Sequence, residues 1–178
     1  MQPPPTAGVP AAATYGGTGG TLLRTGGWAV LLDVTPGHPL VARCWDRLEA
    51  TSDVDELLGA VVTEDLRTVP AFALVRETGV RRVVARGALR LVVDGLEVQA
   101  DRPAGAWLDL PLGEASTVEV TLPTDGSRES SLLLRDGVAV AAGFHLVLLG
   151  ADPGGRDLPR TDDTQPFFGT LGGVWTPR

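Results

Sequence analysis

The chain of 178 residues contains no lysine, no isoleucine and no asparagine, and all 15 of its basic residues are arginine. These three residue types are encoded by AT-rich codons, so their joint absence indicates a gene from a GC-rich genome. Without lysine the chain has no P-loop phosphate cradle, no Schiff base and no lysine general base. Without asparagine, many active sites that orient a substrate through an amide are excluded too. The composition therefore says more about which chemistries are excluded than about which one is present.

Cysteine and histidine are also scarce. The single cysteine, Cys44, allows no intramolecular disulfide, and its neighbours at helical spacing are apolar, which favours a small buried thiol over a nucleophile. His38 lies in a Pro-Gly turn, and His145 is expected on the solvated side of a strand. One cysteine and two histidines at these positions do not have the spacing of metal ligands. We therefore expect no metal, no cofactor and no catalytic residue.

The net charge of −7 argues against a nucleic-acid surface, which needs a clustered basic stripe. The densest arginines are Arg81, Arg82, Arg86 and Arg90, and we interpret them as a solvated sheet face. Residues 1–21 lack the charged start of a secretory signal, and no run approaches the roughly 18 apolar residues of a membrane helix. We therefore expect a cytoplasmic protein that binds neither nucleic acid nor membrane.

Apolar residues at helical spacing predict two consecutive helices, at 39–50 and 53–65. Ser52 and Asp55 form an expected capping pair for the second helix. The apolar stripe of that helix contains Val54, Leu57, Leu58, Val61 and Val62.

From residue 71 onward the period changes to two, which predicts short strands separated by turns, the clearest being Asp94-Gly95. Strands are expected at 23–33, 72–76, 80–86, 88–94, 96–100, 106–110, 117–122, 131–135, 138–142 and 144–149. This order predicts an α+β fold, with two N-terminal amphipathic helices packed on a mainly antiparallel β-sheet or β-sandwich. We expect a disordered Pro/Gly-rich arm at 1–21, a globular domain at 22–150 and a flexible tail at 151–178.

Two of the threonines in the tail, Thr161 and Thr164, have acidic residues beside them and bulky apolar residues after them. This pattern resembles substrates of bacterial transmembrane Ser/Thr kinases. Phosphorylation would add about −1.5 to −2 charges, which an arginine cluster on a reader domain can bind. The alternative interpretation is an acidic, solubilising linker.

A possible docking peptide follows, because large apolar residues lie between glycines there. Its anchors are Phe167, Phe168, Leu171 and Trp175. The segment loosely resembles the Gly-Leu-rich loading peptides of encapsulated cargo proteins. The alternative is that these residues pack back on the sheet of the same chain.

Residues 25–121 contain the motifs TGGWAVLLDV, CWDRLEATSDVDELLGAVV, VPAFALVRE and VRRVVARGALRLVV. In this order they resemble the N-terminal accessory domain of actinobacterial proteins that carry a forkhead-associated domain at their far end. A forkhead-associated domain recognises phosphothreonine through an arginine, a serine and an asparagine. Because this chain has no asparagine, that domain is absent here and its activity is not carried over. The resemblance implies a signalling or scaffold context.

Together these observations predict a non-catalytic interaction or scaffold module in Ser/Thr phosphosignalling. Its expected partner is a protein, either a phosphopeptide reader or a Ser/Thr kinase. One alternative is a structural component of a protein assembly, docked through its C-terminal tail. Another is a ligand-binding or enzymatic domain with a pocket between the helices and the sheet.

Overall fold

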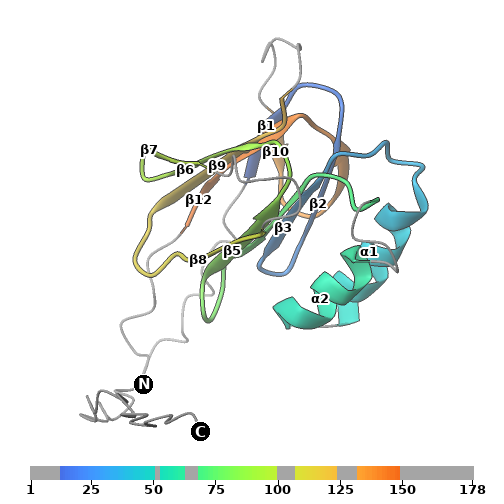
Figure 1. The fold of residues 1–178 in the computed structure, drawn as a ribbon, viewed down its shortest axis with the longest axis horizontal. Coiled ribbons are helices and arrows are strands. Elements are labelled where there is room, and N and C mark those ends of the chain that lie inside the picture. The colour runs from blue at the N-terminus through green and yellow to red at the C-terminus, as the bar shows by residue number, and fades with distance from the viewer. Residues whose placement is uncertain (1–12, 51–52, 63–67, 100–106, 124–131, 149–178) are drawn as a thin grey trace, which may run out of the picture.

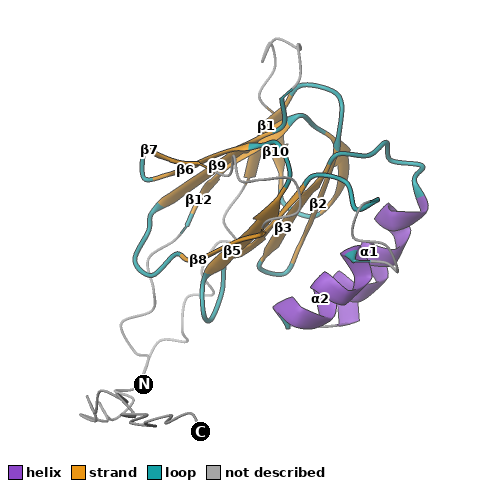
Figure 2. Ribbon diagram, viewed as in Figure 1, coloured by secondary structure: helices purple, strands orange, loops and turns teal. Residues whose placement is uncertain are grey.

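The computed structural model describes residues 13–50, 53–62, 68–99, 107–123 and 132–148. In these ranges twelve strands form two six-stranded antiparallel sheets, stacked as a sandwich with two helices on one side (Figures 1 and 2). The predicted α+β class is therefore wrong. The fold is β-sandwich-like, and its helices are inserted after the third strand instead of standing at the N-terminal end of the domain.

The two sheets are named here after their first strands. The β1 sheet contains, in spatial order, β10 (Leu132–Leu134), β1 (Ala13–Gly16), β12 (Gly143–Val147), β9 (Thr117–Thr121), β6 (Arg90–Val93) and β7 (Leu96–Gln99). The β2 sheet contains β11 (Gly137–Val140), β2 (Thr21–Thr25), β3 (Trp28–Leu32), β4 (Phe72–Arg76), β5 (Arg82–Arg86) and β8 (Trp107–Pro111). At each side of the sandwich, two strands that follow one another in the chain are the edges of the two sheets.

The main core lies between the two sheets. Alternate residues of the β2 sheet, such as Leu22, Leu31 and Val75, point into it and are fully buried. Val120 and Phe144 meet them from the β1 sheet. This alternation is what two sheets packed face to face require, because successive side chains of a strand point to opposite faces.

A second core lies on the other face of the β2 sheet, under helices α1 (Pro39–Ala50) and α2 (Val54–Val61). Because β3 is covered on both faces, every one of its residues is buried. The predicted helix at 39–50 is confirmed. In α2, Leu57 is fully buried and Leu58 is only partly buried. The N-cap of α2 is Asp53, whereas the expected capping residue Ser52 lies outside the described residues.

The predicted strand at 23–33 is in fact the hairpin of β2 and β3. Its turn is made by Gly26 and Gly27, whose φ angles are 47° and 110°. Positive φ angles are readily adopted by glycine and rarely by other residues, so this pair breaks what reads in the sequence as one apolar run.

The boundary of the predicted disordered arm at residue 21 is also wrong. Ala13 is fully buried in β1, which pairs with both β10 and β12, and Thr21 begins β2. Between these strands the glycine-rich segment 17–20 carries the chain from one sheet to the other. A Cβ atom on Gly20 would lie 2.7 Å from the carbonyl oxygen of Leu32, so glycine is required by close packing. Residues 1–12 and 149–178 lie outside the described residues.

Candidate interaction surface

The residues that the sequence singles out in the tail lie outside the described residues. They are the phosphorylation candidates Thr161 and Thr164 and the docking candidates Phe167, Phe168, Leu171 and Trp175. The structure therefore neither brings them together nor separates them.

The thiol and the two imidazoles have structural surroundings. Cys44 is fully buried between α1 and the β2 sheet, and burial raises the pKa of its thiol to about 11, which keeps it protonated at neutral pH. The backbone N–H of Leu40 donates to Nδ1 of His38 at 3.1 Å, so His38 helps to start α1. His145 lies on the outer face of the β1 sheet, beside Thr14 and Glu119.

Within the described ranges, no group of three or more His, Cys, Asp and Glu side chains is placed to hold a metal ion. Neither α1 nor α2, the two helices of that part of the chain, is long and apolar enough to cross a membrane.

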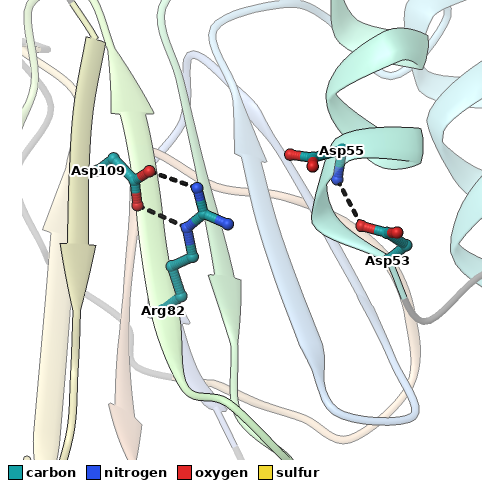
Figure 3. A network of polar contacts seen from close by, with 4 residues as sticks. All are labelled: Asp53, Asp55, Arg82 and Asp109. Atoms are coloured by element: carbon teal, nitrogen blue, oxygen red, sulfur yellow. Dashed lines mark hydrogen bonds and ion pairs between the residues drawn. The ribbon is translucent and has the colours of Figure 1, made fainter. Parts of the chain in front are cut away.

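A charged cluster lies where α2 approaches β5 and β8 (Figure 3). The guanidinium of Arg82 donates two hydrogen bonds to the carboxylate of Asp109, and these bonds lower the pKa of Asp109. Asp53 accepts a hydrogen bond from the backbone N–H of Asp55 at 2.9 Å. These groups are paired within the fold, and the ion pair is partly exposed, so the cluster serves the local structure and offers little net stability.

The other arginines of the predicted basic sheet face are dispersed. Arg81 is buried and donates to the carbonyl oxygen of Ala115 at 3.3 Å. The guanidinium of Arg86 lies over the ring of Trp107, whereas Arg90 is on the other sheet. The expected single solvated face is therefore wrong: Arg82 and Arg86 share one face of β5, but Arg81 is buried and Arg90 belongs to the other sheet.

A buried ion pair closes one end of the core. Arg24 of β2 donates two hydrogen bonds to the carboxylate of Glu77, at 2.7 and 2.9 Å. Both side chains are almost completely enclosed. Burial raises the pKa of Glu77, and the opposing effect of Arg24 is smaller. Because the two charges satisfy each other, we interpret this pair as a structural one.

Four of the seven large apolar side chains that are exposed in the described ranges lie at one edge of the sandwich. Leu132 and Leu133 of β10 are 55% and 73% exposed, and Val138 and Val140 of β11 are 45% and 47% exposed. Among the described strands, β10 has β1 as its only neighbour and β11 has β2. Alternate backbone N–H and C=O groups of an edge strand point away from its sheet. Within the described ranges, backbone groups that no neighbouring strand pairs and exposed apolar side chains therefore occur together along residues 132–140.

These side chains are exposed because successive side chains of a strand point to opposite faces of the sheet. Three consecutive leucines cannot all face the core, and Leu133 points outward while Leu134 packs against the core. In β11 the small Ala139 pairs with the buried Leu22, so Val138 and Val140 point to the opposite face. Sequence reasoning missed this surface, although the run of leucines and the outward valines were its signal.

The opposite edge of the sandwich is built differently. Strand β7 carries Glu97, which is paired with Arg90 at 3.0 Å. Strand β8 carries the ion-paired Asp109 and ends at Pro111, which has no backbone N–H. Charged side chains and proline on an edge strand discourage the addition of another strand. The β10–β11 edge contains neither within its strands.

No family model, no curated protein and no solved structure matches this chain. The resemblance of residues 25–121 to a forkhead-associated accessory domain stays a prediction.

Proposed function

We propose that the chain is a non-catalytic protein-interaction module that binds an extended, uncharged apolar peptide by strand addition along β10 and β11. One observation carries the proposal. Among the described strands, the free edges of the two sheets and four exposed large apolar side chains lie on the same stretch of chain, residues 132–140. Strand addition uses both features, because backbone hydrogen bonds supply affinity and alternate side chains supply specificity.

The chemistry of the edge determines which peptide fits. Fully burying a valine or leucine side chain contributes about 1.5–3 kcal/mol relative to leaving it exposed, so a peptide with large apolar side chains gains from covering Leu133, Val138 and Val140. A charged side chain placed against either strand would lose its hydration without gaining a partner there, since the charged residues of 132–140, Arg135 and Asp136, lie at the bend between β10 and β11. The surface therefore selects against charged strands.

A non-catalytic role is supported by the surroundings of Cys44, which carries the one thiol of the sequence. Cys44 is buried with its pKa raised to about 11. The contact between the helices and the β2 sheet consists of buried apolar side chains, which is the composition of a packed core and not of a polar pocket. We keep Ser/Thr phosphosignalling as the proposed context on the sequence around Thr161 and Thr164.

A peptide-display selection tests this function. The bait is the full chain in which Phe167, Phe168, Leu171 and Trp175 are replaced by serine, so that its own apolar segment does not compete; we call it the tail variant. Enriched peptides should be uncharged, with large apolar residues at alternate positions.

The binding of these peptides should be lost in the tail variant that also carries Leu133→Glu. The matched control is Leu96→Glu, because Leu96 is as exposed as Leu133 but lies on β7, the other edge of the same sheet. A selection that enriches no peptide, or peptides that bind both charged variants equally, would remove the proposed function.

A further inference from the structure

The chain itself contains a segment with the chemistry that the proposed peptide site requires. Residues 166–175, PFFGTLGGVW, include no charged residue and provide two phenylalanines, a leucine, a valine and a tryptophan. The acidic residues Asp162 and Asp163 precede this segment, and two uncharged residues, Thr164 and Gln165, lie between them and it. It is therefore an uncharged apolar stretch, the kind of peptide proposed above for the β10–β11 edge.

The described part of the chain ends close to this edge. Leu148 follows β12, and β12 is separated from β10 by β1 alone. In register, Leu146 pairs with Ala13 and Ala13 pairs with Leu134, so the chain leaves the β1 sheet at the end of β10 that leads into β11. Two strand spacings amount to about 10 Å. A random-coil chain as long as residues 149–166 has a root-mean-square span of about 25 Å, so the distance is easily covered.

The shape of the edge also matches the segment. Residues 132–140 run along the β1 sheet, change direction at Arg135 and Asp136, and continue along the β2 sheet. A strand added along both parts has to bend at the same place. Residues 167–175 are equally long and contain glycines within the stretch, and glycine permits such a bend.

We propose that residues 167–175 add as a strand to β10 and β11 of the same chain. This inference rests on the proposed function, because it names the occupant of the same surface. Tethering gives the segment an effective concentration in the millimolar range, so an external peptide has to displace it. The tail then acts as an internal competitor, which raises the concentration of partner that is needed for binding.

Hydrogen exchange measured by mass spectrometry on the full chain tests this arrangement. Amides of residues 132–140 should exchange about tenfold more slowly in the wild type than in the tail variant, because a paired edge must open before it exchanges. Leu133→Glu should abolish the difference, and Leu96→Glu should leave it unchanged. Exchange of the fully buried β3 serves as the folding control, and Trp175→Ser alone should give a partial loss of protection.

Equal exchange of residues 132–140 in the wild type and the tail variant would overturn the inference. Protection that appears only as the chain dimerises, judged by light scattering at increasing concentration, would also overturn it, because the occupant would then be a second copy. If displayed peptides bind the tail variant while the wild-type edge is unprotected, the proposed function survives and the inference fails. If neither peptides nor tail engage the edge, both fail.

Discussion

Replacing Gly20 with alanine tests the sandwich at the corner where the chain passes from β1 to β2. A Cβ atom there would lie 2.5 Å from the Cδ1 methyl of Leu122, 2.7 Å from the carbonyl oxygen of Leu32 and 2.9 Å from that of Ala141. The leucine methyl can rotate away. The two oxygens belong to the backbone of β3 and of the link into β12, so relief requires the corner to move.

Overpacking of this kind costs about 1–3 kcal/mol. Because two backbone atoms are involved, we expect Gly20→Ala to lower the free energy of unfolding by about 2–3 kcal/mol, at the upper end of that range. The matched control is Gly59→Ala in α2, where an added Cβ meets nothing within 4 Å. There we expect a gain of about 0.5–1 kcal/mol, because alanine is the better helix former.

The assay is urea unfolding of the full chain, followed by tryptophan fluorescence, with the slope m compared between variants. Opposite signs for the two substitutions are the expected result. A change below about 0.5 kcal/mol for Gly20→Ala, the size usual for surface sites, would mean that residues 17–20 are not a packed corner. The arm boundary at residue 21 would then stand. Equal losses for both variants would indicate an effect of glycine itself and not of packing.

Leu57→Ala should cost about 2–5 kcal/mol in the same assay, and Leu58→Ala clearly less, because only Leu57 is fully buried; equal losses would contradict this packing of α2. The carboxylate of Asp94 accepts hydrogen bonds from two backbone N–H groups at the start of β9, which lower its pKa. Its contribution to stability is therefore present above its ordinary pKa and lost as pH falls through the lowered pKa. Asp94→Asn should reduce the loss in the free energy of unfolding between neutral and acid pH. An unchanged pH dependence would refute a stabilising role for the Asp94 carboxylate. Phosphorylation of Thr164 by a Ser/Thr kinase of the same cell, mapped by mass spectrometry, should speed the exchange of residues 132–140, because it adds about −1.5 to −2 charges beside two strands that carry no charged side chain. Labelling that spares the tail threonines would remove the phosphosignalling context.

Local elements of the fold could be predicted from the sequence. The helix at 39–50 follows from its period, and the Asp94-Gly95 hairpin between β6 and β7 follows from its turn residues, whose φ angles are 49° and 78°. The division into two sheets could not be predicted in this way. Strands β10 and β11 are almost continuous in the chain and yet belong to different sheets, which depends on pairing with residues more than a hundred positions away.

Strand β1 was missed for a physical reason too. Its sequence, ATYG, has little apolar signal, and the glycines after it have the composition of a flexible arm. Close packing and flexibility both favour glycine, so composition does not separate them. The candidate site shows the same limit. The apolar anchors of the tail are visible in the sequence, whereas the outward direction of Leu133, Val138 and Val140 is set by which sheet each strand joins.

The most direct test of the β10–β11 edge as a docking surface is a nuclear Overhauser experiment on the isotopically labelled full chain. We predict cross-strand contacts between residues 167–175 and the backbone of Leu133, Val138 or Val140. They should persist when labelled chains are diluted into an excess of unlabelled ones, as an intramolecular strand requires. Random-coil chemical shifts for residues 167–175, with no contact to β10 or β11, would contradict the account.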